Sequence, residues 1–284
     1  MNGKVCVVTG ASSGIGKATS LALAGLGTDV IMICRDKARG EAALAEVAAM
    51  AGAGQSRLEI ADLSSLQELR DLAGRLARLD RLDVLINNAG LVLGDRRVTV
   101  DGYEYTFALN HLAPFLLTNL LREKLVASAP ARVITVSSAA HRSARLDLAD
   151  LQLEQHYGGW RAYCNSKLDN ILFTTELASR LAGTGVTANC LHPGLVNTGF
   201  GRDGSSLVRF GLDLGRRFLI TADQAAGTVI YLASSPDVES ATGGYYVKRE
   251  LRTPARAARN QATARRLWEI SAGLTGLPEA GQPA

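Results

Sequence analysis

The chain has 284 residues, of which 47% are hydrophobic and 20% are charged, and its formal net charge is +4. This composition excludes a disordered chain and supplies enough apolar residues for one large core or two small ones. No apolar run reaches the roughly 18 residues of a membrane span. The first expected strand begins within four residues of Met1, which leaves no room for a signal peptide. We therefore expect a cytoplasmic protein without a membrane span.

Short apolar runs alternate with helical patterns along the chain. The expected strands are Lys4–Thr9, Asp29–Cys34, Ser56–Ile60, Asp83–Asn87, Arg132–Ser137, Thr187–Leu191 and Gly244–Val247. The expected helices are Gly14–Leu26, Lys37–Met50, Ser64–Ala77, Gly102–Ala127, Trp160–Ala182 and Ala222–Ser234. This alternation predicts an α/β fold: a doubly wound, parallel, seven-stranded sheet with helices on both faces. Ligands of such folds bind at the carboxyl ends of the strands.

Basic residues gather late in the chain, where a single acid, Glu250, stands among them. They are Lys248, Arg249, Arg252, Arg256, Arg259, Arg265 and Arg266. The pattern indicates a solvated helix face or, alternatively, a phosphate or membrane-surface patch. No aromatic residue is interleaved before Trp268, so nucleic acid is not an expected partner. Residues 251–284 are expected to form a basic C-terminal helix and tail.

The cysteines and histidines show no ligand spacing. The cysteines, which form no CxxC pair and are expected to be reduced packing residues, are Cys6, Cys34, Cys164 and Cys190. The histidines lie far apart, at His111, His141, His156 and His192. No metal site is therefore expected.

The stretch TGASSGIG, residues 9–16, joins the first expected strand to the first expected helix and places Gly10, Gly14 and Gly16 in a GxxxGxG pattern. Glycine permits a positive φ and a close approach of the backbone to a phosphate. The N–H groups of a helix N-terminus attract a pyrophosphate. Alone, the motif also fits a plain tight turn. Its strand-to-helix context favours a dinucleotide site, which we place in a catalytic domain of residues 1–250.

Arg35 follows Cys34, the last residue of the second strand. NAD-binding proteins usually place an acid there, on the ribose 2′-OH. A guanidinium suits a 2′-phosphate instead, with Lys17 and Arg39 as further cations. This favours NADP(H), whereas Asp36, which is close by, leaves NAD(H) open. The alternative is that Arg35 is a plain surface charge.

Further motifs follow in order: DL at 62–63, NNAG at 87–90, LNHL around Asn110, SS at 137–138, YCNSK at 163–167 and HPG at 192–194. With these, the chain resembles the short-chain dehydrogenase/reductase family nearly end to end, which implies a Rossmann-type fold. The stretches NHLAPFLLTNLL at 110–121, VSSAAH at 136–141, YCNSKLDNILFTTEL at 163–177 and KRELRTPARAARNQATARRLWEIS near the end look like its retinol-dehydrogenase-like branch. Many such enzymes interconvert lipophilic carbonyls and alcohols with NADP(H). Some of these enzymes carry an N-terminal membrane anchor that has no counterpart in this sequence. This weakens the case for a membrane lipid as the substrate.

The resemblance implies a catalytic tetrad of Asn110, Ser138, Tyr163 and Lys167. Tyr163 and Lys167 share one face of a helix. Tyr163 would exchange a proton with the substrate oxygen. The Lys167 ammonium would lower the pKa of Tyr163 from its usual value of about 10 and would bind the nicotinamide ribose. Ser138, rather than Ser137, would polarise the carbonyl, and Asn110 would hold a water that relays protons from Lys167.

The resemblance also implies the cofactor contacts. They are Gly10, Ser12, Ser13, Gly14, Ile15 and Gly16 at the turn, Arg35, then Asp62 and Leu63 beside the adenine, then Asn88, Ala89 and Gly90 in the cleft, and Tyr163, Lys167, Pro193, Gly194, Val196 and Thr198 at the nicotinamide end. For NNAG the alternative is a strand cap that braces the sheet, above all at Asn87. Residues 195–220 are expected to form an apolar substrate lid, or alternatively a disordered surface insertion. Residues 139–159 would form another wall, which favours a lipophilic substrate.

Together these features predict an NADP(H)-dependent oxidoreductase that interconverts a small-molecule ketone or aldehyde and its alcohol. One alternative is a non-catalytic NADP(H)-binding sensor or scaffold, although such proteins usually lack the tyrosine or the lysine. Others are a protochlorophyllide-type reductase and a secondary-metabolite tailoring ketoreductase. Many relatives form dimers or tetramers through the helices equivalent to Gly102–Ala127 and Trp160–Ala182. A homodimer or homotetramer is therefore open, and the basic C-terminal segment could block or add contacts.

Overall fold

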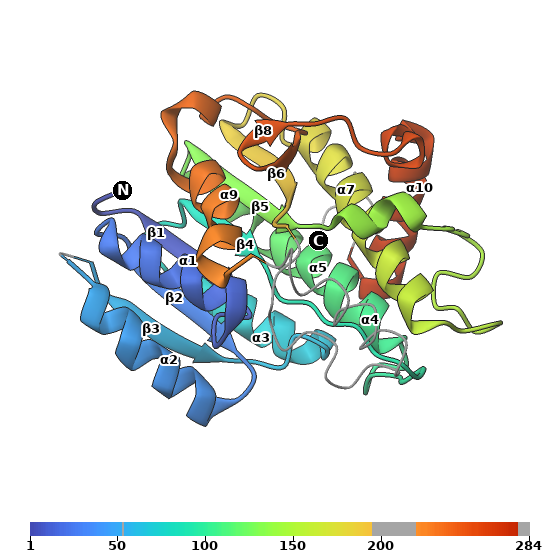
Figure 1. Cartoon of the computed structure of the whole chain (residues 1–284), viewed down its shortest axis with the longest axis horizontal. Coiled ribbons are helices and arrows are strands. Elements are labelled where there is room, and N and C mark those ends of the chain that lie inside the picture. Colours follow the sequence, from blue (N-terminus) through green and yellow to red (C-terminus); the bar gives the residue numbers. More distant parts are fainter. Residues whose placement is uncertain (53, 195–219, 278–284) are drawn as a thin grey trace.

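The computed structural model describes residues 1–52, 54–194 and 220–277 (Figure 1). One sheet has the strand order β3-β2-β1-β4-β5-β6-β7-β8. Its strands are β1 (Val5–Thr9), β2 (Asp29–Cys34), β3 (Ser56–Ile60), β4 (Val84–Asn87), β5 (Ala131–Val136), β6 (Val186–His192), β7 (Tyr245–Val247) and β8 (Glu250–Leu251). The strands from β1 to β7 run parallel, as predicted. The short β8 pairs antiparallel with β7 and was not expected, because two residues carry no periodic pattern.

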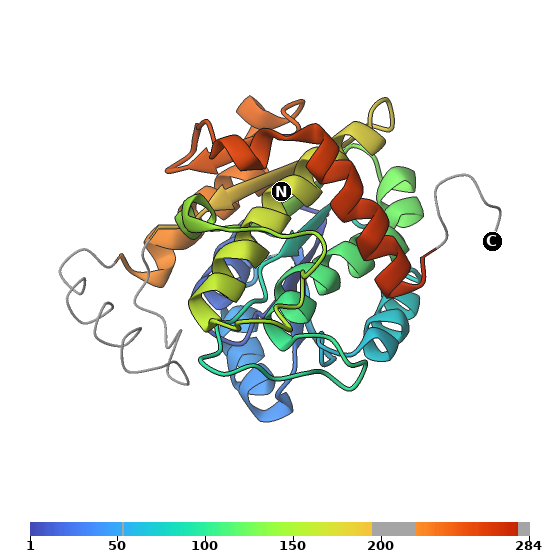
Figure 2. The ribbon, with the colours of Figure 1, turned by 90° about the vertical axis from the view of Figure 1, so that its right-hand side faces the viewer.

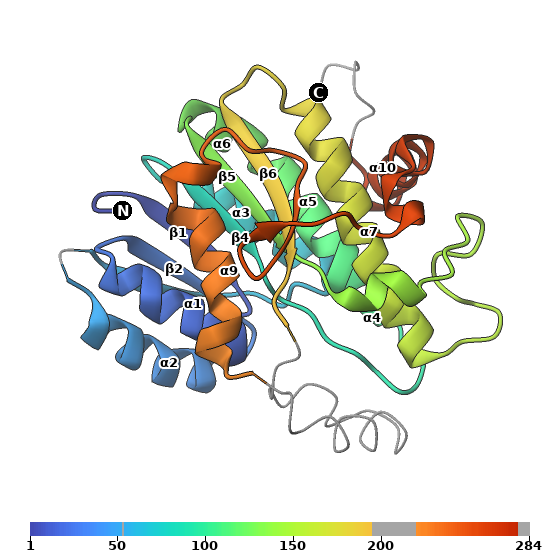
Figure 3. The same cartoon turned by 45° about the horizontal axis from the view of Figure 1, so that its top comes forward.

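The helices form two layers around this sheet (Figures 1 and 3). They are α1 (Gly14–Gly25), α2 (Lys37–Met50), α3 (Leu66–Leu76), α4 (Tyr105–Phe107), α5 (Ala113–Leu120), α6 (Arg122–Ala127), α7 (Gly159–Arg180), α9 (Ala222–Ser234) and α10 (Gln261–Thr275). Alternate residues of a strand point to opposite faces. Val7 thus packs with α3, α5 and α7, whereas Cys6 and Val8 pack with α1, α2 and α9.

The strand order places the site. The chain runs outward through β1, β2 and β3, and then crosses over to β4 on the other side of β1. A doubly wound sheet binds its ligand at this switch point, outside the carboxyl ends of the strands. Thr9, Asn87 and Val136 end three neighbouring strands at that edge.

The helix expected over Gly102–Ala127 is interrupted, which corrects the prediction. After α4, residues Ala108–Leu112 form a π-helical turn, and a break at Leu121 separates α5 from α6. Pro114 has no N–H to donate to the carbonyl of Asn110, four residues earlier, so regular α-helical bonding stops there. The interruption therefore falls on a member of the expected tetrad. The other expected elements are present, with small differences at their ends.

The C-terminal helix α10 packs along α7 and α5 of the same chain (Figure 2). The Trp268 ring lies 4.9 Å from the Phe115 ring and 5.8 Å from the Phe173 ring, centroid to centroid. The Arg180 guanidinium lies 4.4 Å above the Trp268 ring, a cation–π contact. This helix thus covers part of α7 and α5.

Candidate active site

The turn between β1 and α1 depends on its glycines. Gly10 and Gly14 have φ angles of +66° and +54°, in the left-handed region that favours glycine. A Cβ atom on Gly16 would lie 2.3 Å from the carbonyl oxygen of Gly10 and 2.5 Å from Nδ2 of Asn88. Backbone geometry therefore requires all three glycines of the pattern.

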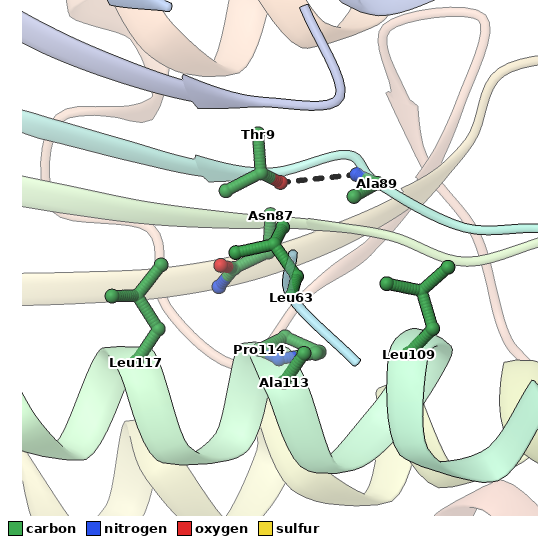
Figure 4. Close-up of a pocket in the computed structure, with 8 residues that line it drawn as sticks. All are labelled: Thr9, Leu63, Asn87, Ala89, Leu109, Ala113, Pro114 and Leu117. Carbon is green, nitrogen blue, oxygen red and sulfur yellow. Dashed lines mark hydrogen bonds between the residues drawn. The ribbon is translucent and has the colours of Figure 1, made fainter. Parts of the chain in front are cut away.

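The NNAG stretch fixes this turn against β4. The Asn88 side chain donates to the carbonyl oxygens of Thr9 (2.8 Å) and Gly10 (3.4 Å). The Thr9 hydroxyl accepts from the backbone N–H groups of Asn88 (2.9 Å) and Ala89 (3.0 Å; Figure 4). Asn87 donates to the Thr118 hydroxyl of α5 at 3.0 Å. It therefore braces the end of β4 against this helix, in line with the structural role that was the alternative for Asn87.

The N-terminus of α1, like that of α7, has no side-chain cap, unlike those of α2, α3, α9 and α10. The helices α2, α3, α9 and α10 begin with a side chain that accepts from an N–H of the first turn, namely Asp36, Ser65, Thr221 and Asn260. The side chain of Ser13, which precedes α1, makes no such bond within the described residues. The N–H groups of that first turn suit an anion, so the stretch Ser12–Gly16 fits a dinucleotide pyrophosphate.

Two arginines stand beside the glycine turn. Arg39 Nη2 lies 3.4 Å from the Ser13 hydroxyl, which it reaches from α2. Arg35, directly after β2, donates from Nη1 to the Tyr105 hydroxyl at 2.9 Å. Both side chains are exposed, so their charges are accessible to a phosphate ligand.

Other polar residues of the expected cofactor end are engaged within the protein. Asp36 caps α2, and Lys17 forms an ion pair with Glu46 at 2.6 Å. Asp62 accepts from the backbone N–H (2.9 Å) and the hydroxyl (2.7 Å) of Ser64. Its neighbour Leu63 lines a small cavity between the strand ends and α5 (Figure 4).

Ser138, Tyr163 and Lys167 come together at the end of β5. Tyr163 and Lys167 lie on α7, and the Ser138 side chain, just after β5, lies close enough to the Tyr163 hydroxyl to lower its pKa. The Lys167 ammonium lies 5.6 Å from the centre of the Tyr163 ring and donates to the carbonyl of Val136 at 3.1 Å. Two elements far apart in the sequence thus supply one compact polar group.

Asn110 lies beside this group. Its side chain accepts from the N–H of Leu91 and donates to the carbonyl of Leu91, both at 2.9 Å, and it also donates to the Ser166 hydroxyl at 3.0 Å. A Cβ atom on Gly90 would lie 3.2 Å from Asn110 Oδ1 and 3.4 Å from Lys167 Nζ. Gly90 therefore lies between Asn110 and Lys167, and the four tetrad positions share one site.

The two serines of the SS pair have different partners. The Ser137 hydroxyl donates to the carbonyl of Lys167 at 2.6 Å and is buried. The Ser138 hydroxyl faces Tyr163 and accepts from the N–H of Ala140 at 3.2 Å. Ser137 thus braces α7, while Ser138 is the serine that faces the site.

Burial governs the ionisation of the central pair. It raises the pKa of Tyr163 to about 12, with a smaller opposite effect from Ser138, and it lowers the pKa of Lys167 to about 8. The Tyr163 pKa is therefore raised in this structure and not lowered by Lys167 as expected, because loss of hydration has the largest effect on it. Tyr163 is a protonated phenol at neutral pH, as a proton donor must be.

Pro193 and Gly194 follow β6 at the same edge of the sheet. Gly194 has a φ of +105°, and a Cβ atom there would lie 2.5 Å from Cδ1 of Ile220. Val196, Thr198 and the expected lid up to residue 219 lie outside the described residues.

The sequence interpretation missed two side chains that support the tetrad. Ser166 bonds Asn110 and donates to the carbonyl of Tyr163 at 2.8 Å. His141 bonds the carbonyl of Ser138 at 2.7 Å. Ser166 lies in YCNSK and His141 lies in VSSAAH, two stretches that carry the family resemblance. Their place in these stretches is the only sequence feature that could have pointed to them.

The described part of the chain holds no group of three or more His, Cys, Asp or Glu side chains that could bind a metal. None of its helices is both long and apolar enough to cross a bilayer. The four cysteines are free and buried, as the sequence predicts.

The site combines a helix N-terminus that suits an anion, at the switch point of the sheet, with a tyrosine that can donate a proton. This is the arrangement of an oxidoreductase that uses a nicotinamide dinucleotide. The family model described as short chain dehydrogenase matches residues 4–206. The chain belongs to the short-chain dehydrogenase/reductase family, in its retinol-dehydrogenase-like branch, and is an oxidoreductase that acts on CH–OH groups.

The similar proteins include curated relatives and solved structures. The chain is 43% identical to Retinol dehydrogenase 11 from Mus musculus over 279 residues, which cover 97% of this chain and 87% of that protein. It is also 43% identical to Retinol dehydrogenase 14 from Homo sapiens over 297 residues, with coverages of 98% and 88%. The crystal structure of an uncharacterized protein from Mycobacterium paratuberculosis aligns with a TM-score of 0.78 and 36% identity, covering 97% of this chain and 94% of that one. A blue fluorescent protein from a metagenomic library, in complex with NADPH, aligns with a TM-score of 0.69 and 30% identity, with coverages of 86% and 95%.

Proposed function

We propose that the protein interconverts a lipophilic aldehyde or ketone and its alcohol, with NADP(H) as the preferred cofactor. The observation that carries this proposal is the buried Tyr163, which Ser138 faces and whose ring centre lies 5.6 Å from the Lys167 ammonium. A phenol with a raised pKa retains its proton until a substrate oxygen develops negative charge, and then donates it.

Each side chain has a separate task in this reaction. When bound, the nicotinamide cofactor supplies or takes up the hydride. Ser138 orients the carbonyl oxygen by a hydrogen bond, and Tyr163 gives that oxygen its proton. Lys167, with a pKa of about 8, returns a proton to Tyr163, through a water held at Asn110.

Two observations support a lipophilic substrate. Trp160, one turn before Tyr163 on α7, is 53% exposed, and the two ring centroids lie 5.6 Å apart. An exposed aromatic ring beside the proton donor offers an apolar substrate a surface to pack against. The relatives named above are retinol dehydrogenases. A cytoplasmic location and a homodimer or homotetramer stay proposals.

The function is tested by following the absorbance of NADPH and NADH with a panel of aldehydes and ketones, retinal included. We expect turnover with NADPH, fastest with the apolar members of the panel. Cofactor binding without turnover of any member would contradict the proposal and favour a sensor or scaffold. Faster turnover with NADH would contradict the cofactor preference alone.

The preference for NADP(H) rests on Arg35. Replacing Arg35 with glutamine is expected to raise the KM for NADPH by roughly 10- to 150-fold, the loss of one charge-assisted hydrogen bond of about 1.5–3 kcal/mol. The KM for NADH should stay nearly constant, because NADH carries no 2′-phosphate. Steady-state kinetics with both cofactors measure the difference.

The matched control is Lys37→Gln, since Lys37 is an exposed cation at the start of α2 that pairs with Glu41. It should leave both KM values as in the wild type. Equal losses for NADPH and NADH in Arg35→Gln would mean that Arg35 does not recognise the 2′-phosphate.

A further inference from the structure

A buried histidine connects the candidate catalytic serine to the C-terminal segment. His141 lies in the short 3-10 helix Ala139–Ser143, which directly follows Ser138. Its ring Nδ1 lies 2.7 Å from the carbonyl oxygen of Ser138, and its ring Nε2 lies 3.1 Å from the backbone nitrogen of Ala255. The ring thus bridges two segments that are more than a hundred residues apart in the sequence.

These partners admit one protonation state of the ring. The carbonyl of Ser138 can only accept, so Nδ1 carries the proton. The nitrogen of Ala255 can only donate, so Nε2 is unprotonated and accepts. His141 is therefore a neutral imidazole in the Nδ1–H form. A second proton, on Nε2, would point at the N–H of Ala255 and break that bond.

The surroundings of His141 hold the ring in place. The side chain is 1% exposed, and the Tyr245 ring of β7 meets it edge-on at 5.1 Å between centroids. Burial lowers the pKa of His141, and the neighbouring Arg142 charge acts in the same direction. Arg142 also donates to the carbonyl of Thr253 at 3.1 Å, which is a second link to the same C-terminal segment. His192 is a further titratable group nearby, and burial lowers its own pKa to about 4.

We propose that His141 is a positioning residue for Ser138, and that residues 253–255 are part of the active-site framework. This inference rests on the proposed role of Ser138 in orienting the substrate carbonyl. The carbonyl of Ser138 accepts from the backbone N–H of His141 (3.2 Å) as well as from its ring. The ring bond and its anchor at Ala255 thereby fix the backbone that aims the Ser138 hydroxyl. Displacements of about 1 Å at such a group can cost about a hundredfold in rate.

Three variants separate positioning from folding. His141→Leu keeps an apolar side chain and removes both ring bonds. His141→Asn retains a donor where Nδ1 stands but does not reach Ala255. His156→Asn is the matched control, because His156 is an exposed histidine with a φ of +55°, which asparagine tolerates. For each variant, kcat, the substrate KM, the Kd of NADPH and the unfolding temperature are measured.

We expect His141→Leu to lower kcat at least about tenfold, with the Kd of NADPH unchanged. His141→Asn should recover part of that loss, and His156→Asn should match the wild type. A folded His141→Leu variant with wild-type kcat would overturn the inference. If instead the wild type turned over no substrate at all, the proposed function would fail, which is a different outcome.

A second measurement needs no turnover and reads the wild-type protein directly. NMR of the wild type with 15N-labelled histidine reports the tautomer of each ring at neutral pH. His141 should appear as the neutral Nδ1–H form, assigned by the absence of its signals in His141→Asn. An Nε2–H tautomer or an imidazolium at this position would overturn the inference.

Discussion

Replacing Tyr163 with phenylalanine is expected to lower kcat for carbonyl reduction by about a thousandfold, within the range that proton transfer from a positioned side chain contributes. The substitution removes the hydroxyl alone. The ring remains, so its packing against Trp160 and below Lys167 is retained. The fold and the Kd of NADPH should therefore change little. Steady-state reduction of the best carbonyl in the panel, with thermal unfolding alongside, makes the comparison.

Tyr231→Phe provides the matched control, because it deletes the same atom from a tyrosine on α9 that takes no part in the site. Its kcat should equal that of the wild type. Wild-type kcat in Tyr163→Phe would eliminate Tyr163 as the proton donor and with it the reaction proposed here.

The two central pKa values also set the direction of the pH dependence. Lys167 is protonated below about 8, so it can return a proton to Tyr163 there, and carbonyl reduction should decline as the pH rises above that value. Alcohol oxidation runs the proton transfers in reverse and should rise over the same range. The Tyr163 phenol, with a pKa of about 12, does not itself titrate in this range, so the pH dependence follows Lys167, to which Tyr163 passes its proton in the oxidation direction. Initial rates in both directions, measured across neutral to alkaline pH, show whether the slopes are opposite.

Much of the fold is predictable from sequence because its signals are local. A parallel strand buried on both faces is a continuous apolar run, and the helices between such runs have their own period. The glycine turn is a local signal too, because Gly10 and Gly14, which both have a positive φ, lie within a stretch of five residues. The family resemblance places Ser138 and Tyr163 in the site, but only the tertiary fold brings these two positions side by side.

The features of the site that the sequence could not predict depend on the folded structure. The pKa of Tyr163 follows mainly from how much water the fold removes from its hydroxyl. The π-turn at Asn110 depends on Pro114, yet a proline near a helix start is equally compatible with a regular helix. His141 shows no spacing to any other histidine, because its partners are backbone groups.

The C-terminal helix shows the same limit from the opposite side. Its arginines predict a solvated face, and Arg265 and Arg266 are indeed exposed. The inner face carries Trp268 and the fully buried Ser271, whose hydroxyl lies 2.9 Å from His111 Nε2, next to Asn110. The basic pattern thus described only half of the helix, and the apolar half attaches it to the core beside the site.

The glycine turn gives the second large effect, in stability and cofactor binding together. Gly16→Ala is expected to destabilise the fold by about 1–3 kcal/mol, the usual cost of overpacking. It is also expected to weaken NADPH binding by about tenfold or more, which corresponds to about 1.4 kcal/mol of binding free energy for each factor of ten. The added Cβ atom would meet the Gly10 carbonyl at 2.3 Å and Asn88 Nδ2 at 2.5 Å. Neither is the free end of a flexible side chain, because Asn88 is bonded to the turn itself. Relief requires the turn to open, which moves the N–H groups that suit the pyrophosphate.

Gly25→Ala is the internal comparison, since Gly25 closes the same helix and a Cβ atom there would meet nothing within 4 Å. Alanine in place of a helical glycine stabilises by roughly 0.5–1 kcal/mol, so this variant should unfold at or slightly above the wild-type temperature and bind NADPH normally. Chemical denaturation and fluorescence titration with NADPH, run on both variants, resolve the two effects. Identical behaviour of Gly16→Ala and Gly25→Ala would show that the turn tolerates a side chain and that its glycines are not needed for closure. A stable Gly16→Ala that has lost only NADPH affinity would assign Gly16 to the ligand rather than to the turn.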